Sequence, residues 1–256
     1  MNDLLEIDPK TESVRIINFI KTTLKEQGFK KVVLGMSGGV DSATGFYLLK
    51  DAVEPSNILI AHLPYFQSKL KDFKSSLTKA QVPNRNIYEL SIRDIVDKLK
   101  KILNIRDKDK IRLGNIMARI RMIILYDFAK KHNALVLGTE DKSEFYLGYY
   151  TRFGDEASDI EPIRHLYKTQ VYQLAKYLGV PKEIINQKSS PDLWLGQTAE
   201  NELGFSYKEA DRVLYLYFEQ KNRLSEIISK GLPNAKQIID WTSKNSFKHK
   251  LPYTAE

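Results

Sequence analysis

The spacing between apolar residues changes several times along this chain. Short apolar runs at 30–36, 57–64, 86–90 and 134–139 predict buried strands. The segments at 42–49, 73–81, 91–103 and 116–131 have helical spacing. A further helix is predicted ahead of the first strand, where apolar residues recur at spacings of three and four and Gly28 follows: Val14, Ile17, Ile20 and Leu24.

This alternation of strands and helices predicts an α/β fold, a doubly wound parallel sheet with helices on both faces. Ligands bind such sheets beyond the carboxyl ends of the strands, where residues 36–42 and 139–144 fall. Beyond Lys168 only helices are predicted. We therefore expect a single domain over 1–256, with a nucleotide-binding α/β core at about 29–165 and a helical C-terminal extension at about 166–256.

Composition narrows the class of protein. The chain has 256 residues, 42% hydrophobic and 28% charged, which is typical of a globular protein with a substantial core. No apolar run approaches the roughly 18 residues of a membrane span, and the first residues are acidic, so we expect a cytoplasmic protein without a membrane partner. The absence of cysteine excludes disulfides, thiolate metal sites and cysteine nucleophiles. A net charge of +8 suits either a nucleic acid or a polyanionic small molecule.

The segment GMSGGVDS at 35–42 lies between the first predicted strand and a helix. It lacks the Gly-Lys-Ser/Thr ending of a Walker A loop. Backbone N–H groups at Ser37, Gly38 and Gly39 would still converge at the positive end of a helix and bind an anion. Asp41 would hold a Mg²⁺ ion that bridges phosphate oxygens. Alternatively, Ser37 caps the helix and Asp41 complements its dipole, and spacing alone favours neither interpretation.

Two arginines lie in the helix predicted after Asn115, which is a candidate N-cap. At about 100° per residue, Arg119 and Arg121 point to nearly opposite sides, so only one faces a given ligand. Arg119 shares its face with Met122 and Tyr126, a suitable surface for a nucleotide or a second subunit. The pattern alone favours ordinary surface arginines.

Carboxylates are concentrated at 140–161 of this basic chain. They could form a solvated acidic loop. We favour the alternative in which Mg²⁺ carried by ATP lies beside them, because the ion would offset the repulsion between the carboxylates.

Lys168 begins a predicted helix, where a positive charge is unfavourable unless it meets an anion such as a phosphate. Ser190 precedes Pro191 and is either an N-cap or a hydroxyl donor to a phosphate.

Several motifs together carry a family resemblance: SGGVDS, GNIMARIRM, GTEDKSE, GYYTRFGDEASDIEP, LYKTQVYQLA and GQTAENELGFSY. The first resembles the pyrophosphate loop of the N-type ATP pyrophosphatases, whose fold is adenine nucleotide alpha hydrolase-like. In their order and spacing, the six motifs resemble the ammonia-dependent NAD synthetases. The resemblance implies that the carboxylate of deamido-NAD attacks the α phosphate of ATP and releases pyrophosphate. Ammonia then displaces AMP from the acyl adenylate and gives NAD, which is the last step of NAD biosynthesis.

The resemblance also implies cofactors, partners and residue roles. It implies Mg²⁺ as cofactor, ATP as co-substrate, deamido-NAD and ammonia as substrates, and a homodimer with deamido-NAD bound at the subunit boundary. Asp41, Lys168 and Asp155 would be catalytic, and Asp41 with Glu144 would bind the metal. The implied ATP contacts are Gly35, Met36, Ser37, Gly38, Gly39, Val40, Asp41, Ser42, Thr139, Lys168 and Ser190. The implied deamido-NAD contacts are Arg119, Arg152, Asp159, Glu200 and Lys248.

Two other functions stay open at this stage. An ATP-dependent enzyme that modifies a tRNA base would use the positive charge for backbone contacts, but it leaves the acidic span at 140–161 without a role. A nucleotide-binding regulator without catalysis is supported by Ala199, where the family commonly has aspartate, and by the changed C-terminal element Phe247-Lys248-His249. We expect no nucleic-acid partner. With no cysteine and no additional domain for glutamine hydrolysis, ammonia is the expected nitrogen source.

Overall fold

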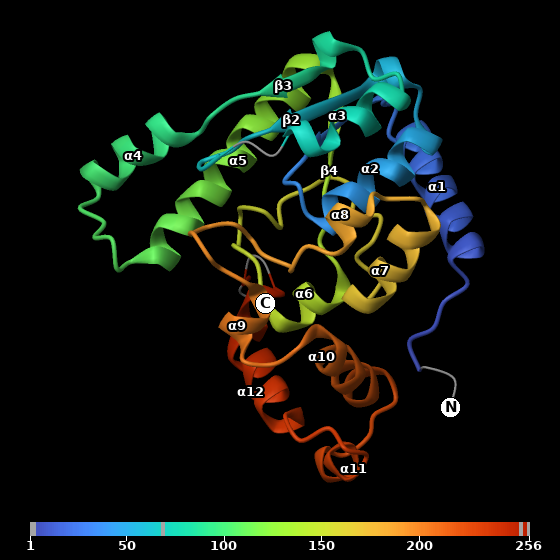
Figure 1. Ribbon diagram of the computed structural model, residues 1–256, viewed down its shortest axis with the longest axis vertical. Helices are drawn as coiled ribbons and strands as arrows, with labels where there is room; N and C mark the ends of the chain where they lie inside the picture. The colour runs from blue at the N-terminus through green and yellow to red at the C-terminus, as the bar shows by residue number, and fades with distance from the viewer. Residues whose placement is uncertain (1–3, 68–69, 251–252, 255–256) are drawn as a thin grey trace.

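The computed structural model describes residues 4–67, 70–250 and 253–254, and a parallel sheet lies at its centre (Figure 1). In the described residues the sheet has four strands in the order β3-β2-β1-β4. Their bounds are Lys31–Gly35 (β1), Ile58–His62 (β2), Ile87–Glu89 (β3) and Ala134–Leu137 (β4). The register places Val33 beside both Leu59 and Val136. The four predicted strands are therefore confirmed.

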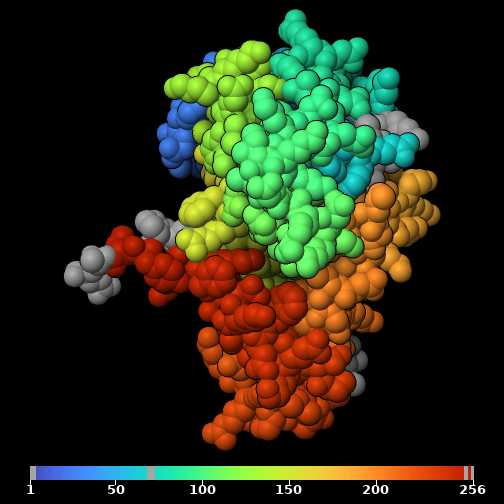
Figure 2. Space-filling view, turned by 90° about the vertical axis from the view of Figure 1, so that its left-hand side faces the viewer, coloured from blue at the N-terminus to red at the C-terminus, as the bar shows by residue number. Residues whose placement is uncertain are grey.

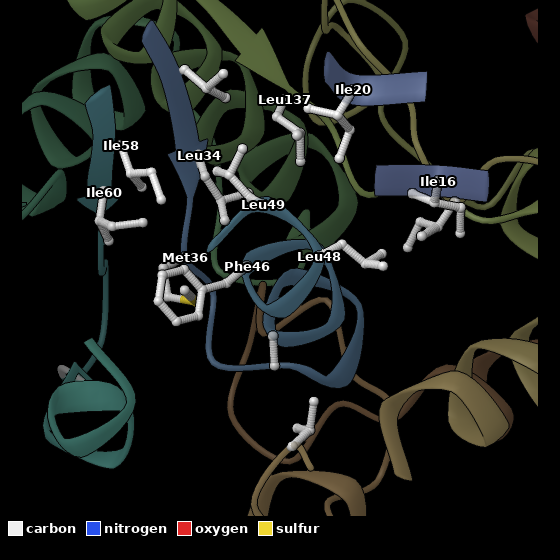
Figure 3. Packing of buried hydrophobic residues seen from close by; sticks show 14 of the residues in the cluster. Ile16, Ile20, Leu34, Met36, Phe46, Leu48, Leu49, Ile58, Ile60 and Leu137 are labelled. Carbon is white, nitrogen blue, oxygen red and sulfur yellow. The ribbon is translucent and has the colours of Figure 1, made fainter. Parts of the chain in front are cut away.

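One face of the sheet is covered by helices from the first third of the chain. These are α1 (Pro9–Glu26), α2 (Val40–Ala52) and α3 (Leu70–Lys79). Leu34 of β1 and Ile58 of β2 point to this face and pack with Phe46 of α2 and Ile20 of α1 (Figure 3). All four are fully buried, so this face carries the main hydrophobic core.

The opposite face is covered by α4 (Arg93–Ile102) and α5 (Lys110–His132). Val33 and Leu59, each next in sequence to a residue of the first core, point this way and pack with Val96 of α4 and Met117 of α5. Because successive strand residues alternate between faces, apolar runs in β1 and β2 fill both cores. The predicted doubly wound α/β architecture is confirmed.

Two helices differ from their predicted form. In α1 the buried side is formed by Ile16, Ile20 and Leu24, whereas Val14 is 52% exposed. Several neighbouring isoleucines give this helix two overlapping apolar stripes, and spacing did not decide between them. The predicted helix at 116–131 begins earlier, at Lys110. Asn115 is therefore inside the helix and is no N-cap; its Oδ1 accepts a hydrogen bond from Thr151 Oγ1 (2.9 Å).

Beyond Lys168 the regular structure is helical, as expected, and a short helix that was not predicted, at Lys142–Leu147, precedes it. The bounds are Lys142–Leu147 (α6), Lys168–Tyr177 (α7), Lys182–Ile185 (α8), Ala199–Leu203 (α9), Tyr207–Leu214 (α10), Leu224–Ser229 (α11) and Ala235–Asn245 (α12). A π-helical turn, Tyr215–Glu219, extends α10, and short 3₁₀ turns lie at Pro55–Asn57, Asn84–Asn86 and Ser246–Lys248.

Helices α9 to α12 form a lower lobe beneath the sheet (Figure 1), and Figure 2 shows it in orange and red below α4 and α5. This lobe has its own core, which includes Leu203, Leu214 and Ile238. The start of the helical part at about residue 166 stays a proposal, because Val171 of α7 and Ile184 of α8 belong to the core under α2. Within the described residues, none of the helices has the length and apolar character of a bilayer span.

Candidate active site

The glycine loop connects the carboxyl end of β1 to the start of α2. Gly38 has a φ of 100°, a backbone conformation that L side chains rarely adopt, so glycine is required there. The Ser37 hydroxyl accepts a hydrogen bond from Gly39 N (3.2 Å) and lies 3.0 Å from the Ser42 hydroxyl. The N-cap of α2 is Gly39, not Ser37. The alternative in which Ser37 caps the helix is therefore wrong, and the first N–H groups of α2 have no partner within the helix.

A cavity of about 300 Å³ lies over this loop, at the carboxyl ends of three strands. Its walls come from 35–42 after β1, 61–67 at the end of β2 and 136–140 at the end of β4. Strand order reverses between β1 and β4, the position where open α/β sheets bind ligands. Every residue of the predicted ATP set lines this cavity except Lys168, which lies behind its wall, and the predicted residues Glu144 and Asp155 line it as well.

Lys168 is fully buried and its ammonium group contacts three carboxylates. Its Nζ atom lies 2.8 Å from Asp41 Oδ1, 3.0 Å from Asp141 Oδ2 and 2.9 Å from Glu144 Oε1. Glu144 accepts a directed hydrogen bond from this group. Three predicted residues, Asp41, Glu144 and Lys168, are thus brought together although more than 100 positions separate the first from the others.

The charges in this cluster do not balance. One ammonium group faces three carboxylates, which leaves an excess of two negative charges when all are ionised. Burial raises the pKa of Asp141 and of Glu144, and Lys168 opposes that rise. Burial lowers the pKa of Lys168, but the attraction of Asp141, Asp41 and Glu144 outweighs it and raises that pKa well above its ordinary value. The lysine is therefore a permanent cation in a site that favours additional positive charge.

The N-termini of α6 and α7 position the charged groups of this cluster. Asp141 caps α6: its Oδ1 accepts from Glu144 N (2.8 Å), and Glu144 Oε2 accepts from Asp141 N (3.4 Å). This capping box fixes both carboxylates at one helix N-terminus. Lys168 is the first residue of α7, as predicted from the sequence. Its unfavourable position at the helix start is offset by the three carboxylates.

The carboxyl groups at 140–161 differ in exposure: Glu140 and Asp141 are buried, whereas Asp155 and Asp159 are exposed, so the span is not a uniformly solvated acidic loop. Asp141 is fully buried and Glu140 is 6% exposed. Glu161 fits beside Gly138, where a Cβ atom would lie 2.0 Å from Glu161 Oε1. Glu140 forms an ion pair with Arg164, whose Nη1 lies 3.5 Å from Oε2. Burial, with help from Glu161, raises the pKa of Glu140 to about 9 despite Arg164.

This raised pKa predicts a pH-dependent stability. The folded chain holds the Glu140 proton more tightly than the unfolded chain, whose carboxyl titrates near 4.5, so the free energy of unfolding falls as pH rises towards about 9. One group contributes at most about 1.4 kcal/mol per pH unit. Glu140→Gln should therefore show a shallower decline between about pH 6 and about pH 9 in urea unfolding. Glu89→Gln, on the exposed edge of β3, should keep the parent slope, and equal slopes for both variants would contradict the assignment.

The predicted deamido-NAD residues lie outside the cavity lining. Arg119 is exposed and donates from Nη2 to Arg152 O (3.1 Å). Asp159 accepts from Val136 N (2.8 Å), and Glu200 accepts from Tyr207 N at the start of α10 (3.0 Å). Lys248 donates to Gly148 O (2.5 Å) and Tyr150 O (2.8 Å) just after α6. Their contact with deamido-NAD remains a proposal.

Two residues at the site, Arg121 and Asp141, were not assigned a role from the sequence. Arg121, and not Arg119, is the arginine of α5 that lines it, and Arg121 Nε donates to Leu63 O (3.0 Å). Asp141 completes the set around Lys168; its signal was the capping pattern Asp-x-x-Glu. Ser190 lines the cavity and accepts from Asp192 N (3.1 Å) without starting a helix, since the next helix begins at Ala199. The N-cap alternative for Ser190 is therefore wrong.

The donor set fits a magnesium ion shared with a nucleotide. Asp41 and Glu144 are the partly exposed carboxylates of the cluster, with side chains 20% and 21% exposed. In the part of the chain that the structure describes, no group of three acidic or histidine residues is arranged to hold a metal ion. Mg²⁺ commonly uses one or two carboxylates and completes its shell with phosphate oxygens and water. The site therefore suits Mg²⁺ that arrives with ATP.

Comparison with known proteins places the whole chain in one family. The family model described as NAD synthase matches residues 12–252. An NH(3)-dependent NAD(+) synthetase of Fusobacterium nucleatum is 39% identical over 254 residues, which is 98% of each chain. Another, from Sulfurisphaera tokodaii, is 44% identical over 215 residues and covers 83% of this chain and 74% of its own length.

Solved structures agree with this comparison. The NH3-dependent NAD synthetase of Campylobacter jejuni superimposes with a TM-score of 0.81 at 30% identity, over 98% of this chain and 100% of that one. A structure described as an NMN synthetase from Francisella tularensis also has a TM-score of 0.81, at 32% identity, over 98% and 99% of the two chains. The similarity therefore extends over both lobes.

Proposed function

This chain belongs to the NAD synthase family, and we propose that it joins ammonia to deamido-NAD in an ATP-dependent reaction that forms NAD. The observation that carries this proposal is the meeting of Asp41, Glu144 and Lys168 at the mouth of the glycine loop. Two carboxylates and one cation beside a helix N-terminus are suited to a magnesium-bound triphosphate. AMP and pyrophosphate are the other products.

In the first half of the reaction, the carboxylate of deamido-NAD attacks the α phosphate of ATP. N–H groups at the start of α2 and the hydroxyls of Ser37 and Ser42 bind the phosphates that leave as pyrophosphate. We assign to the Lys168 ammonium, which three carboxylates fix behind the cavity wall, the neutralisation of charge that develops on these oxygens. The result is an acyl adenylate. The contribution of the protein is mainly electrostatic and positional.

Asp41 and Glu144 are the residues that would hold Mg²⁺. Bound there, it would supply positive charge that offsets the charge of the phosphates. Its charge would also offset the ionised carboxylates around Lys168. Thr139 and Ser190, both in the cavity wall, are the proposed hydroxyl contacts to ATP.

In the second half, ammonia attacks the carbonyl carbon of the adenylate and AMP leaves. Asp155 lines the cavity and accepts a hydrogen bond from Thr151 N (2.9 Å), which holds one carboxyl oxygen in place. We assign to it the binding of the incoming nitrogen and the acceptance of its proton. Dissolved ammonia of the cytoplasm is the proposed nitrogen source, since the chain has no cysteine to release it from glutamine.

One assay tests the function and its alternatives. Purified protein is incubated with ATP, Mg²⁺, ammonium and deamido-NAD, and NAD and AMP are quantified together. Equal amounts of NAD and AMP are expected. AMP release that requires tRNA would support the base-modifying enzyme instead, and tight ATP binding without turnover would support a regulator.

The same assay decides between a dinucleotide and a mononucleotide substrate. The similarity to a protein described as an NMN synthetase is the reason to make this comparison. Nicotinic acid mononucleotide is supplied in place of deamido-NAD at equal concentration. We expect a higher kcat/KM with the dinucleotide, and the opposite order would reassign the substrate.

We also propose a homodimer. Its support is a set of exposed apolar residues on α4 and α5, the helices over one face of the sheet: Ile95, Ile102, Ile111 and Ile123. The interface would bring Arg119 and Asp159 near a second copy, consistent with their place outside the cavity. Sedimentation should give about twice the 29.6 kDa of one chain, and Ile123→Lys should shift it towards the monomer. A fully active monomer would contradict this arrangement.

A further inference from the structure

The start of α7, which carries Lys168, is bound by residues from two other helices. The backbone N–H of Lys168 donates to Ser143 Oγ (2.8 Å), and that of Thr169 donates to Asp211 Oδ2 (2.8 Å). The Ser143 hydroxyl in turn donates to Asp211 Oδ1 (2.5 Å). Asp211 therefore satisfies, directly or through Ser143, the first two N–H groups of α7, which have no partner within that helix.

This network is closed to solvent. Asp211, Ser143 and Lys168 are all fully buried. Burial raises the pKa of Asp211 to about 6, while the hydrogen bonds from Ser143 and Thr169 oppose the rise, so the carboxylate form predominates at neutral pH. A buried acceptor with both oxygens occupied leaves the helix start little freedom to shift.

The same face of α10 also contacts the side chain of Lys168. Tyr207 lies one helical turn before Asp211 and is 5% exposed. The centre of its ring is 5.2 Å from Lys168 Nζ, within the range of a cation–π interaction. Helix α10 thus contacts both the backbone and the ammonium group of the lysine.

Helix α10 is anchored in the lower lobe and not in the sheet. Ala210, Val213 and Leu214 are fully buried in the core of that lobe. In the described part of the chain, α10 contributes no residue to the cavity wall. Any effect of Asp211 on the reaction must therefore be indirect, through Ser143 and the start of α7, which carries Lys168.

We propose that Asp211 is a positioning residue that uses Ser143 and the start of α7 to hold the Lys168 ammonium at the ATP phosphates. This inference rests on the proposed function of the cavity. It makes the lower lobe part of the active site without direct contact with substrate. A carboxylate is needed because it accepts from Ser143 and from Thr169 at once, whereas the amide of Asn has a single acceptor oxygen.

The test compares Asp211→Asn with Glu209→Gln. Glu209 is also on α10 and also binds another segment, at Asn234 Nδ2 (2.8 Å), and among the described residues its hydrogen bonds join it to Ser206 and Asn234 and not to α7. In Asp211→Asn we expect the KM for ATP to rise and AMP formation to slow by about 10- to 100-fold, because small misplacements of a catalytic group cost that much. The KM for ammonium should stay at the parent value. Glu209→Gln should keep all parent constants.

A purely structural role gives a different result. Partial unfolding of Asp211→Asn would lower kcat in proportion to the folded fraction and leave the KM for ATP unchanged, which would overturn the proposal. If this variant does not fold, Ser143→Ala supplies the same comparison, because it removes the acceptor of Lys168 N and keeps Asp211. Calorimetric binding of ATP with Mg²⁺ is measured in parallel. A parent chain that binds ATP but makes no NAD contradicts the proposed function, while the difference in ATP affinity still decides the role of Asp211.

Discussion

Lys168→Met should slow AMP formation by about 100- to 1,000-fold, because the loss of one preorganised charge at the phosphates costs about that much. It should also destabilise the fold. Methionine has a similar length but leaves Asp41, Asp141 and Glu144 without a cation, and removal of one partner from a buried ion pair costs about 3–5 kcal/mol. The stability loss should shrink as pH falls, since protonation neutralises the remaining carboxylates. Single-turnover AMP formation and urea unfolding measure the two effects.

Lys176→Met is the matched control for this variant. Lys176 is exposed in the last turn of the same helix, so its loss removes a charge without leaving a buried acid unpaired. It should keep the parent rate and nearly the parent stability. A folded Lys168→Met protein with the parent rate of AMP formation would remove Lys168 from the phosphate site.

Asp41→Asn should lower the rate by about 100-fold or more, because a bound metal supplies several kcal/mol of charge stabilisation. Asparagine keeps the shape of the side chain, and the Lys168 ammonium group keeps Asp141 and Glu144 as partners. The fold should therefore be retained. The diagnostic measurement is the rate as a function of Mg²⁺ concentration, in which the half-saturating concentration should rise.

Asp51→Asn controls for the loss of a carboxylate from α2. Asp51 is in the last turn of that helix, 46% exposed, and pairs with Lys50 at the surface. This exchange should leave the Mg²⁺ dependence unchanged. An unchanged dependence in Asp41→Asn would instead remove that residue from the proposed metal site.

The layers of the fold could be predicted because burial on both faces makes β1, β2 and β4 continuously apolar and the connecting helices amphipathic. Helix faces were harder to predict. The angle between Arg119 and Arg121 follows from helix geometry, but only the packing of α5 on the sheet decides that Arg121 turns into the cavity. The wrong prediction that Val14 is on the buried side of α1 has the same cause. Several isoleucines in α1 allow two apolar stripes, and only packing decides which one is buried.

Only some residues of the candidate site could be predicted, because the others depend on contacts between distant parts of the chain. The glycine loop and Lys168 break local rules, so they could be recognised from the sequence alone. Asp141 obeys a local rule as a helix cap, and its second role as a partner of Lys168 depends on a contact across 27 positions. From the sequence alone, Asp211 is likewise an ordinary helix residue. Its hydrogen bond to the start of α7 depends on the packing of α10 against that helix.

The account depends on transfer of an adenylyl group to the deamido-NAD carboxylate within this cavity. The most direct test labels both carboxylate oxygens of deamido-NAD with heavy oxygen, runs the complete reaction with ATP, Mg²⁺ and ammonium, and locates the label by mass spectrometry. The account predicts one labelled oxygen in the phosphate of AMP for every NAD formed. Label in pyrophosphate or inorganic phosphate, or AMP without label, would contradict it.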